Sequence, residues 1–175
     1  MKKIRKILTA TLVLTAFAAL ATPGMAQEGL KDLGKFKDWQ ARSYKEGGKL
    51  VCTMFTTPKS SEGAYTKRGD VFVFVTHRPS HNRVDEVSIN IGYVFKKGAP
   101  VNVVISGVTH ELFSDRGTAW TRDSKSDRAL VRAMRAGSDM TVNGISSRGT
   151  KTTDNFSLSG FSAAHNAISK ACKVR

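Results

Sequence analysis

The chain has 175 residues, with 28 Lys and Arg against 14 Asp and Glu, which gives a formal net charge of +14. This length is enough for one domain with a hydrophobic core and too short to expect two. After the first six residues the basic side chains are scattered instead of forming a block, which argues against a nucleic-acid-binding protein.

Residues 1–26 have the pattern of a secretory signal peptide. Positions 2–6 are rich in Lys and Arg, positions 7–20 are uncharged and mostly apolar, and Gly24 and Ala26 are small residues of the kind that a signal peptidase reads. The apolar run is shorter than the roughly 20 residues of a membrane-spanning helix, which disfavours an anchor that stays in place. We therefore predict cleavage after Ala26 and a mature domain of residues 27–175. Its net charge falls by the four lost cations to +10, and no transmembrane segment remains.

Most of the mature chain follows a strand pattern. A hairpin is predicted where residues 39–44 and 50–57 flank the Gly-containing turn at 45–49. Residues 71–76 are apolar on both faces, which indicates a central strand that is covered on both sides. Further strands are predicted at 86–91, 101–105, 109–113, 118–121, 140–143 and 155–158. Short strands separated by Gly and Pro turns predict an antiparallel sandwich or barrel.

Two segments have helical spacing. Residues 124–136 are predicted to form a helix that is capped by Ser126 and stopped at Gly137. Residues 161–172 form the second, capped by Ser162. Its apolar stripe is Ala164, Ile168, Ala171 and Cys172. Flexible segments are predicted at 27–35, 59–68, 77–85 and after Cys172.

Cys52 and Cys172 are the only two cysteines. An even number in an exported chain predicts a disulfide, which would tie the second helix to an early strand. Two buried free thiols are the alternative. A metal site at these cysteines is disfavoured, because there is no Cys-x-x-Cys pair and no His at ligand spacing.

No motif in the chain indicates catalysis. A Gly-x-Ser-x-Gly elbow is missing, and the segment 144–149 lacks the Lys of a phosphate-binding loop, so it is interpreted as a turn. His77 and His81 are four residues apart, but Pro79 between them argues against a helix and places both in a solvated loop. With Asp85, Glu86 or His110 they could bind a metal ion, although ligand type without geometry is thin evidence. We predict no catalytic, cofactor-binding or metal-ligating residue and no cofactor.

The large aromatic side chains are interpreted as structural. Trp39 and Trp120 are expected in the core or on a sheet face, because a tryptophan buries a large area. Six phenylalanines are assigned to the core: Phe72, Phe74, Phe95, Phe113, Phe156 and Phe161.

Short motifs spread over nearly the whole mature chain resemble the invasion-associated locus B family of proteobacterial envelope proteins. They include Phe36-Lys-Asp-Trp39, Cys52, Val73-Phe-Val-Thr-His-Arg-Pro79, Gly92-Tyr-Val-Phe95, Ala133-Met-Arg-Ala-Gly-Ser138, Asp154-Asn-Phe-Ser-Leu-Ser-Gly-Phe-Ser-Ala-Ala164 and Ala171-Cys172. The resemblance implies an all-β, immunoglobulin-like antiparallel β-sandwich and a location in the cell envelope. For pathogenic members it also implies a role in host-cell invasion. The family has no accepted catalytic residues to assign to this chain.

Two classes of function remain open. The better supported is a non-enzymatic protein of the periplasm, or one attached to the outer membrane or secreted, that binds another envelope protein or a host-surface protein. The alternative is a periplasmic hydrolase or metal-dependent enzyme with a site built from loops. The net charge predicts weak, salt-sensitive contact with anionic lipid or lipopolysaccharide. A pocket of convergent His and acidic groups would favour the enzyme, and an exposed apolar patch would favour the binding protein.

Overall fold

The structure, a computed structural model, describes residues 28–174, and the predicted signal peptide lies outside the described residues. The strands are β1 (Glu28–Phe36), β2 (Trp39–Glu46), β3 (Lys49–Thr56), β4 (Ser60–Gly63), β5 (Phe72–Arg78), β6 (Arg83–Asn90), β7 (Val101–Ile105), β8 (Val108–Asp115), β9 (Thr118–Trp120), β10 (Asp139–Ile145) and β11 (Lys151–Ser157). The helices are the 3-10 turn η1 (Pro79–His81), α1 (Ser124–Ala136) and α2 (Phe161–Cys172).

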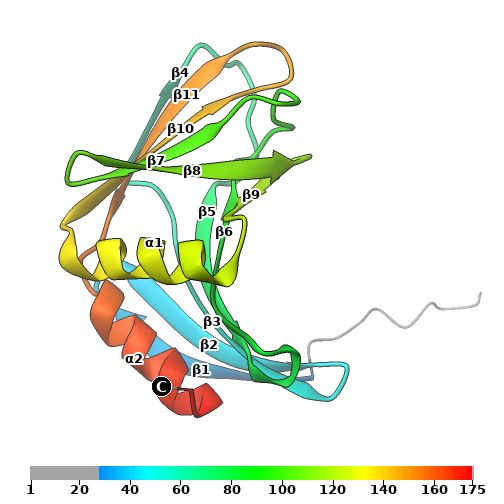
Figure 1. The fold of residues 1–175 in the computed structure, drawn as a ribbon, viewed down its shortest axis with the longest axis vertical. Coiled ribbons are helices and arrows are strands. Elements are labelled where there is room, and N and C mark those ends of the chain that lie inside the picture. The colour runs from blue at the N-terminus through cyan, green and yellow to red at the C-terminus, as the bar shows by residue number, and fades with distance from the viewer. Residues whose placement is uncertain (1–27, 175) are drawn as a thin grey trace, which may run out of the picture.

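All described strand pairs are antiparallel, in the order β1-β2-β3-β5-β6-β9-β8-β7-β10-β11-β4. Figure 1 shows the sheet bending near β8 and β9, so that two halves form a sandwich-like fold. The buried side chains of both halves belong to one hydrophobic core. This confirms the predicted antiparallel sandwich with two short helices and one disulfide.

The helices cover one face of the half of the sheet that is formed by β1, β2, β3, β5 and β6. We call it the β1–β6 half, although β4 belongs to the other half. α2 packs on β1, β2, β3 and β5, while α1 packs on β6 and touches α2 (Figure 1). Alternation along the strands directs Met54, Val75 and Val87 toward this covered side, where all three are fully buried. No helix of residues 28–174 lies on the opposite side of the same strands. No helix in the part of the chain that the structure describes is both long and apolar enough to cross a membrane.

The bounds of both helices match the prediction, but both predicted N-caps are wrong. The cap of α1 is Asp123, whose carboxylate accepts a hydrogen bond from the backbone N–H of Ser126 at 2.7 Å. The N-cap of α2 is Gly160 at φ +92°, without a side-chain hydrogen bond. Ser126 and Ser162 therefore lie inside their helices. The predicted stop at Gly137 is confirmed.

Gly160 sets the start of α2 against β1. A Cβ atom at this position would lie 1.9 Å from the backbone oxygen of Phe36, and the residue already has a left-handed backbone. We expect Gly160→Ala to lower the free energy of unfolding by about 2 kcal/mol or more, because it combines backbone strain with a steric clash. Urea denaturation checks this, with Gly149→Ala as the control, since its added Cβ meets nothing within 4 Å. Equal losses in the two variants would contradict the packing argument.

Three segments that we predicted to be flexible are structured. Residues 28–36 form β1, whose alternation is broken by two register shifts and is therefore hard to recognise. The segment 59–68 contains the edge strand β4 and ends at Arg68, whose guanidinium is buried. The segment 77–85 begins at His77, which is fully buried. Strand β5 is also not covered on both sides, because Phe72 and Phe74 are only partly buried.

Candidate functional site

The uncovered side of the β1–β6 half carries a row of aromatic residues. Cross-strand pairing places one residue of each strand opposite the next: Gln40, Phe55, Phe74, Ser88, Trp120 and Phe113. Side chains of directly paired residues lie on the same side of a sheet. We call the set formed by Phe55, Phe72, Phe74, Phe113, Trp120 and Arg42 the aromatic face.

The rings of the aromatic face contact one another. Phe55, Phe72 and Phe74 form a triangle with ring centroids 5.7–6.1 Å apart. Phe113 lies 5.9 Å from Trp120 and is 40% exposed, so its assignment to the core is wrong. A shallow groove of about 470 Å³ runs along this face and is lined by Arg42, the three clustered phenylalanines and Trp120 among others.

The uncovered side of the other half of the sheet is polar. Its neighbouring strands are joined by side-chain hydrogen bonds from Thr141 to Asn155 and from Thr153 to Asn143, of 2.9 and 3.0 Å. Amide and hydroxyl groups are what a solvated sheet face is expected to carry. The outward sides of β10 and β11 thus carry polar groups where the other half carries the aromatic face, which marks the aromatic face as a candidate binding surface.

Charge is present at the edge of the aromatic face. The guanidinium carbon of Arg42 lies 4.2 Å from the ring centroid of Phe55, a cation–π contact. Among the described side chains, no carboxylate lies within the 4.0 Å that defines an ion pair with Arg42. Arg78, by contrast, is paired with Glu86 at 2.7 Å. Within residues 28–174, Arg42 is therefore a cation of this face without an ion-pair partner, so it can meet a partner's carboxylate.

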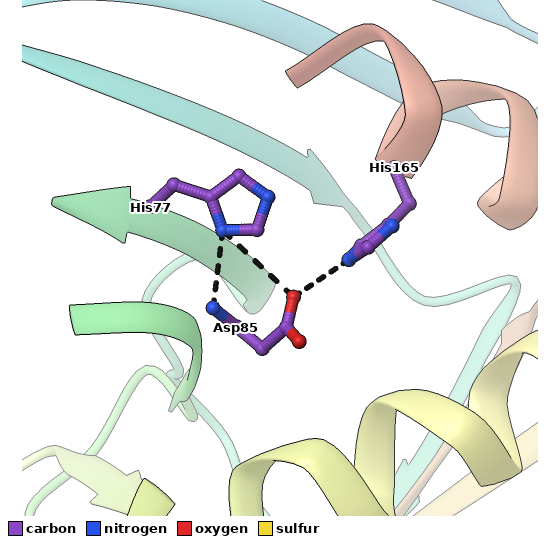
Figure 2. Close-up of side chains that lie close together, drawn as sticks. All are labelled: His77, Asp85 and His165. Atoms are coloured by element: carbon purple, nitrogen blue, oxygen red, sulfur yellow. Dashed lines mark hydrogen bonds and ion pairs between the residues drawn. The ribbon is translucent and has the colours of Figure 1, made fainter. Parts of the chain in front are cut away.

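A second candidate site is buried between the sheet and the helices. His77 of β5, Asp85 of β6 and His165 of α2 lie with one ligand atom each inside a 4.8 Å span (Figure 2). Nε2 of His165 is 2.7 Å from the Asp85 carboxylate, and Nδ1 of His77 is 3.8 Å from it. We call these three residues the histidine cluster.

Neighbouring groups fix the tautomer of both histidines. The backbone N–H of Asp85 donates to Nδ1 of His77 at 3.0 Å, so the proton of that ring is on Nε2, which donates to Ser169 Oγ at 3.1 Å. Arg135 can only donate, and it lies 3.0 Å from Nδ1 of His165. Nε2 of His165 therefore carries the proton that it donates to Asp85.

This arrangement matches neither a metal centre nor a catalytic triad. A metal ion would need the lone pair of Nδ1 in His77 and of Nε2 in His165, but the first already accepts a hydrogen bond and the second nitrogen is protonated. Ser169, His77 and Asp85 lie in the order of a triad. His77, however, donates to the serine and so cannot accept the serine's proton.

Burial sets the titration of the cluster. Burial lowers the pKa of His77 to about 4, against an opposing pull from Asp85. Burial also raises the pKa of Asp85, but the hydrogen bond from His165 and the nearby cations outweigh that, so this pKa lies below its ordinary value. The stable form at neutral pH is a neutral His77 beside an ionised Asp85.

The cluster corrects our interpretation of the histidines. His77 is buried and not in a solvated loop, whereas His81 is exposed in η1 as predicted. Neither Glu86 nor His110 belongs to the cluster. His165 was missed, although its spacing of four from Phe161 and three from Ile168 puts it on the buried stripe of α2.

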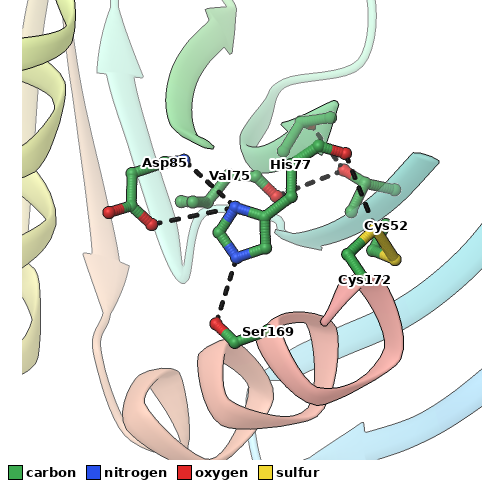
Figure 3. Close-up of a disulfide and its surroundings, with 8 residues drawn as sticks. Cys52, Val75, His77, Asp85, Ser169 and Cys172 are labelled. Atoms are coloured by element: carbon green, nitrogen blue, oxygen red, sulfur yellow. Dashed lines mark hydrogen bonds and ion pairs between the residues drawn. A yellow bond between two sulfur atoms is a disulfide. The ribbon is translucent and has the colours of Figure 1, made fainter. Parts of the chain in front are cut away.

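The predicted disulfide joins the same helix to the sheet. Cys52 of β3 and Cys172 of α2 are bonded with a Cα–Cα distance of 5.9 Å, and both are buried. Cys52 is also the cross-strand partner of His77. Figure 3 shows the bond next to His77 and Ser169, so the covalent link and the histidine cluster hold α2 at adjacent points.

Comparison with known proteins gives one family and one fold. The family described as "Invasion associated locus B (IalB) protein" matches residues 39–169, which include the histidine cluster and the aromatic face. The crystal structure of invasion associated protein b from Bartonella henselae is similar at a TM-score of 0.55 and 17% identity, over 80% of this chain and 96% of that chain. No curated protein matches the chain.

Proposed function

Because the chain belongs to the invasion-associated locus B family, we propose that it is an exported, non-enzymatic envelope protein that binds a protein partner through its aromatic face. The observation that carries this proposal is the row of partly exposed rings on β3, β5, β9 and β8, which crosses β6 at Ser88. In members from pathogens, such binding would contribute to host-cell invasion.

The aromatic face has the composition of a protein-binding surface. Aromatic residues and Arg are enriched at the energetically dominant centres of interfaces, and apolar patches of this kind on a soluble domain mark sites of association. Phe55, Phe72 and Phe74 are partly buried already, so a partner would complete their removal from water without ordering flexible side chains first.

The charges indicate the kind of partner. Arg42 has no ion-pair partner on the described chain, and the mature domain carries a calculated charge of +10 once the four cations of residues 1–26 are removed. Complementarity then favours a protein segment that offers an apolar or aromatic side chain next to a carboxylate. The broad positive charge adds only a weak attraction to anionic lipid or lipopolysaccharide.

Location and processing are part of the same proposal. A signal peptide of residues 1–26, a mature domain of residues 27–175 and a buried disulfide together support export to an oxidising compartment. We assign the protein to the periplasm, with attachment to the outer membrane or secretion as the alternative. An enzymatic role has less support, because both histidines of the cluster are buried and none of its residues lines the groove of the aromatic face.

Single substitutions test the proposal. We expect Phe74→Ala and Trp120→Ala to weaken capture of envelope proteins by the purified mature domain by about tenfold or more, because each removes a ring from the centre of the row. Thr141→Ala, on the polar side of the other half, is the matched control and should bind like the unmodified protein. Circular dichroism establishes that each variant is folded. Equal capture by all variants would contradict the proposal.

Salt separates this interface from diffuse attraction. Charges more than about 8–10 Å apart are largely screened at physiological ionic strength. We expect attachment to anionic vesicles to fall steeply between low and high salt, and capture of the protein partner to change much less, because it rests on apolar burial. Both are measured with the same protein by sedimentation. Loss of both at the same salt concentration would point to charge alone.

A further inference from the structure

The histidine cluster connects α2 to the paired strands β5 and β6 of the sheet. Asp85 binds His77 of β5 through its backbone N–H and His165 of α2 through its carboxylate. Asp85 itself has a left-handed backbone at φ +64°. Such a conformation is strained for a residue with a Cβ and persists where the surroundings hold it in place. The geometry points to Asp85 as a connection between the sheet and α2, in addition to the disulfide and to the hydrogen bond between His77 and Ser169.

We propose that the histidine cluster is an acid-sensitive latch that holds α2 against β5 and β6 at neutral pH and releases it when His77 is protonated. This inference is independent of the proposed partner, since it concerns the covered side of the sheet and not the aromatic face. It assigns a role to a buried titratable group that partner binding does not use.

Protonation of His77 conflicts with the backbone N–H of Asp85. A proton on Nδ1 would meet the backbone N–H of Asp85 at 3.0 Å, where two donors cannot bond. Nε2 already donates to Ser169. The nearest acceptor is the Asp85 carboxylate at 3.8 Å, which is held by His165. A charged His77 therefore has to break the contact with Asp85 N–H and to disturb the one between Asp85 and α2.

The positive charges around the cluster also disfavour a proton on His77. From α1, Arg135 faces His165, and Arg128 adds positive charge near Asp85. From α2, His165 opposes a charge on His77. Asp127 of α1 is engaged elsewhere, by Thr121 and by the backbone N–H of Val87. Asp85 is thus the only described carboxylate that favours a charged His77, and its favourable effect is smaller than the cost of burial.

The direction of the pH effect follows from this. The pKa of His77 is about 4 in the folded protein and 6.5 as an ordinary histidine, so the closed state binds the proton less well than the open state. The packing of α2 against the sheet is therefore unaffected by pH above the pKa of an ordinary histidine. It is weakened progressively as the pH falls from about 6.5 to about 4. One proton taken up on opening raises the open fraction roughly tenfold per pH unit in that window. The disulfide at Cys172 keeps the end of α2 attached.

Hydrogen exchange of the mature protein measures the opening. We expect the protection factors of the α2 amides, which are corrected for intrinsic exchange, to fall roughly tenfold per pH unit between pH 6 and pH 4.5. In His77→Gln they should be independent of pH, because the glutamine does not titrate. His81→Gln, altered at an exposed histidine, should behave like the unmodified protein.

Three results would overturn the latch. One is an unchanged pH dependence in His77→Gln, and another is an equal loss of protection in α1 and β10, which would mean global acid unfolding. The third is stoichiometric zinc binding that His165→Gln abolishes, which would make the cluster a metal centre. If His77→Gln does not fold, the histidine NMR titration of the unmodified protein decides: His77 must stay neutral, with its proton on Nε2, well below pH 6.

Discussion

Asp154→Ala is expected to lower the free energy of unfolding by about 3–5 kcal/mol, the usual cost of leaving one partner of a buried ion pair alone. Asp154 and Arg68 form two parallel hydrogen bonds of 2.8 and 2.6 Å, and their side chains are 0% and 5% exposed. Nε of Arg68 also donates to the backbone oxygen of Ile91 at 2.8 Å. Removal of the carboxylate would leave a desolvated guanidinium without its counter-charge.

Aromatic neighbours limit the access of water to the Arg68 guanidinium once Asp154 is removed. The guanidinium of Arg68 lies over the rings of Tyr65 and Tyr93, at 5.4 and 5.1 Å from their centroids. Urea denaturation of Asp154→Ala measures the loss. The double variant Arg68→Met with Asp154→Leu is the control and should recover part of it, because an apolar pair has no unpaired charge. A loss below about 1 kcal/mol in Asp154→Ala would contradict burial of the pair.

Removal of the disulfide is expected to have the other large effect. The bond between Cys52 and Cys172 spans 120 positions, and a closed loop of that size restricts the unfolded chain by about 4–5 kcal/mol in the chain-entropy model. Replacing both cysteines with Ala should lower the free energy of unfolding by about 2–5 kcal/mol, and reductant should destabilise the unmodified protein to a similar degree.

Thiol chemistry provides the control for this experiment. Labelling of unreduced, denatured protein should find no free cysteine, and labelling after reduction should find two. Quantitative labelling before reduction would show that the bond does not form in the exported protein. Equal stability of the protein with and without reductant would contradict the chain-entropy argument.

Local patterns were enough to predict most of the elements. Val87, Ile89 and Ile91 alternate with polar residues and are all buried, because one side of β6 faces the core. The bounds of α1 and α2 follow from helical spacing and from the Gly residues near their ends. Strand β1 was not recognised, because its register shifts interrupt the period of two on which the prediction of a strand depends.

The candidate sites depend on long-range packing, which a local pattern does not contain. Arg68 was placed at the end of a flexible segment, because its partner Asp154 is 86 residues away in the sequence. His77 was placed in a loop because Pro79 follows it, whereas strand β5 extends through Arg78. Phe72 and Phe74 were assigned to the core because alternation does not reveal which side of a strand remains uncovered.

Partner binding by the aromatic face is the central claim, and site-specific photo-crosslinking in living cells tests it most directly. A benzophenone amino acid replaces Phe74 in the middle of the row or, as the control, Thr141 on the polar side of the other half. We predict a discrete crosslinked protein from position 74 and none from position 141. The product from position 74 should be lost when the same protein also carries Trp120→Ala. Crosslinks of equal yield from both positions, or a product only from position 141, would contradict the proposal that the aromatic face binds the partner.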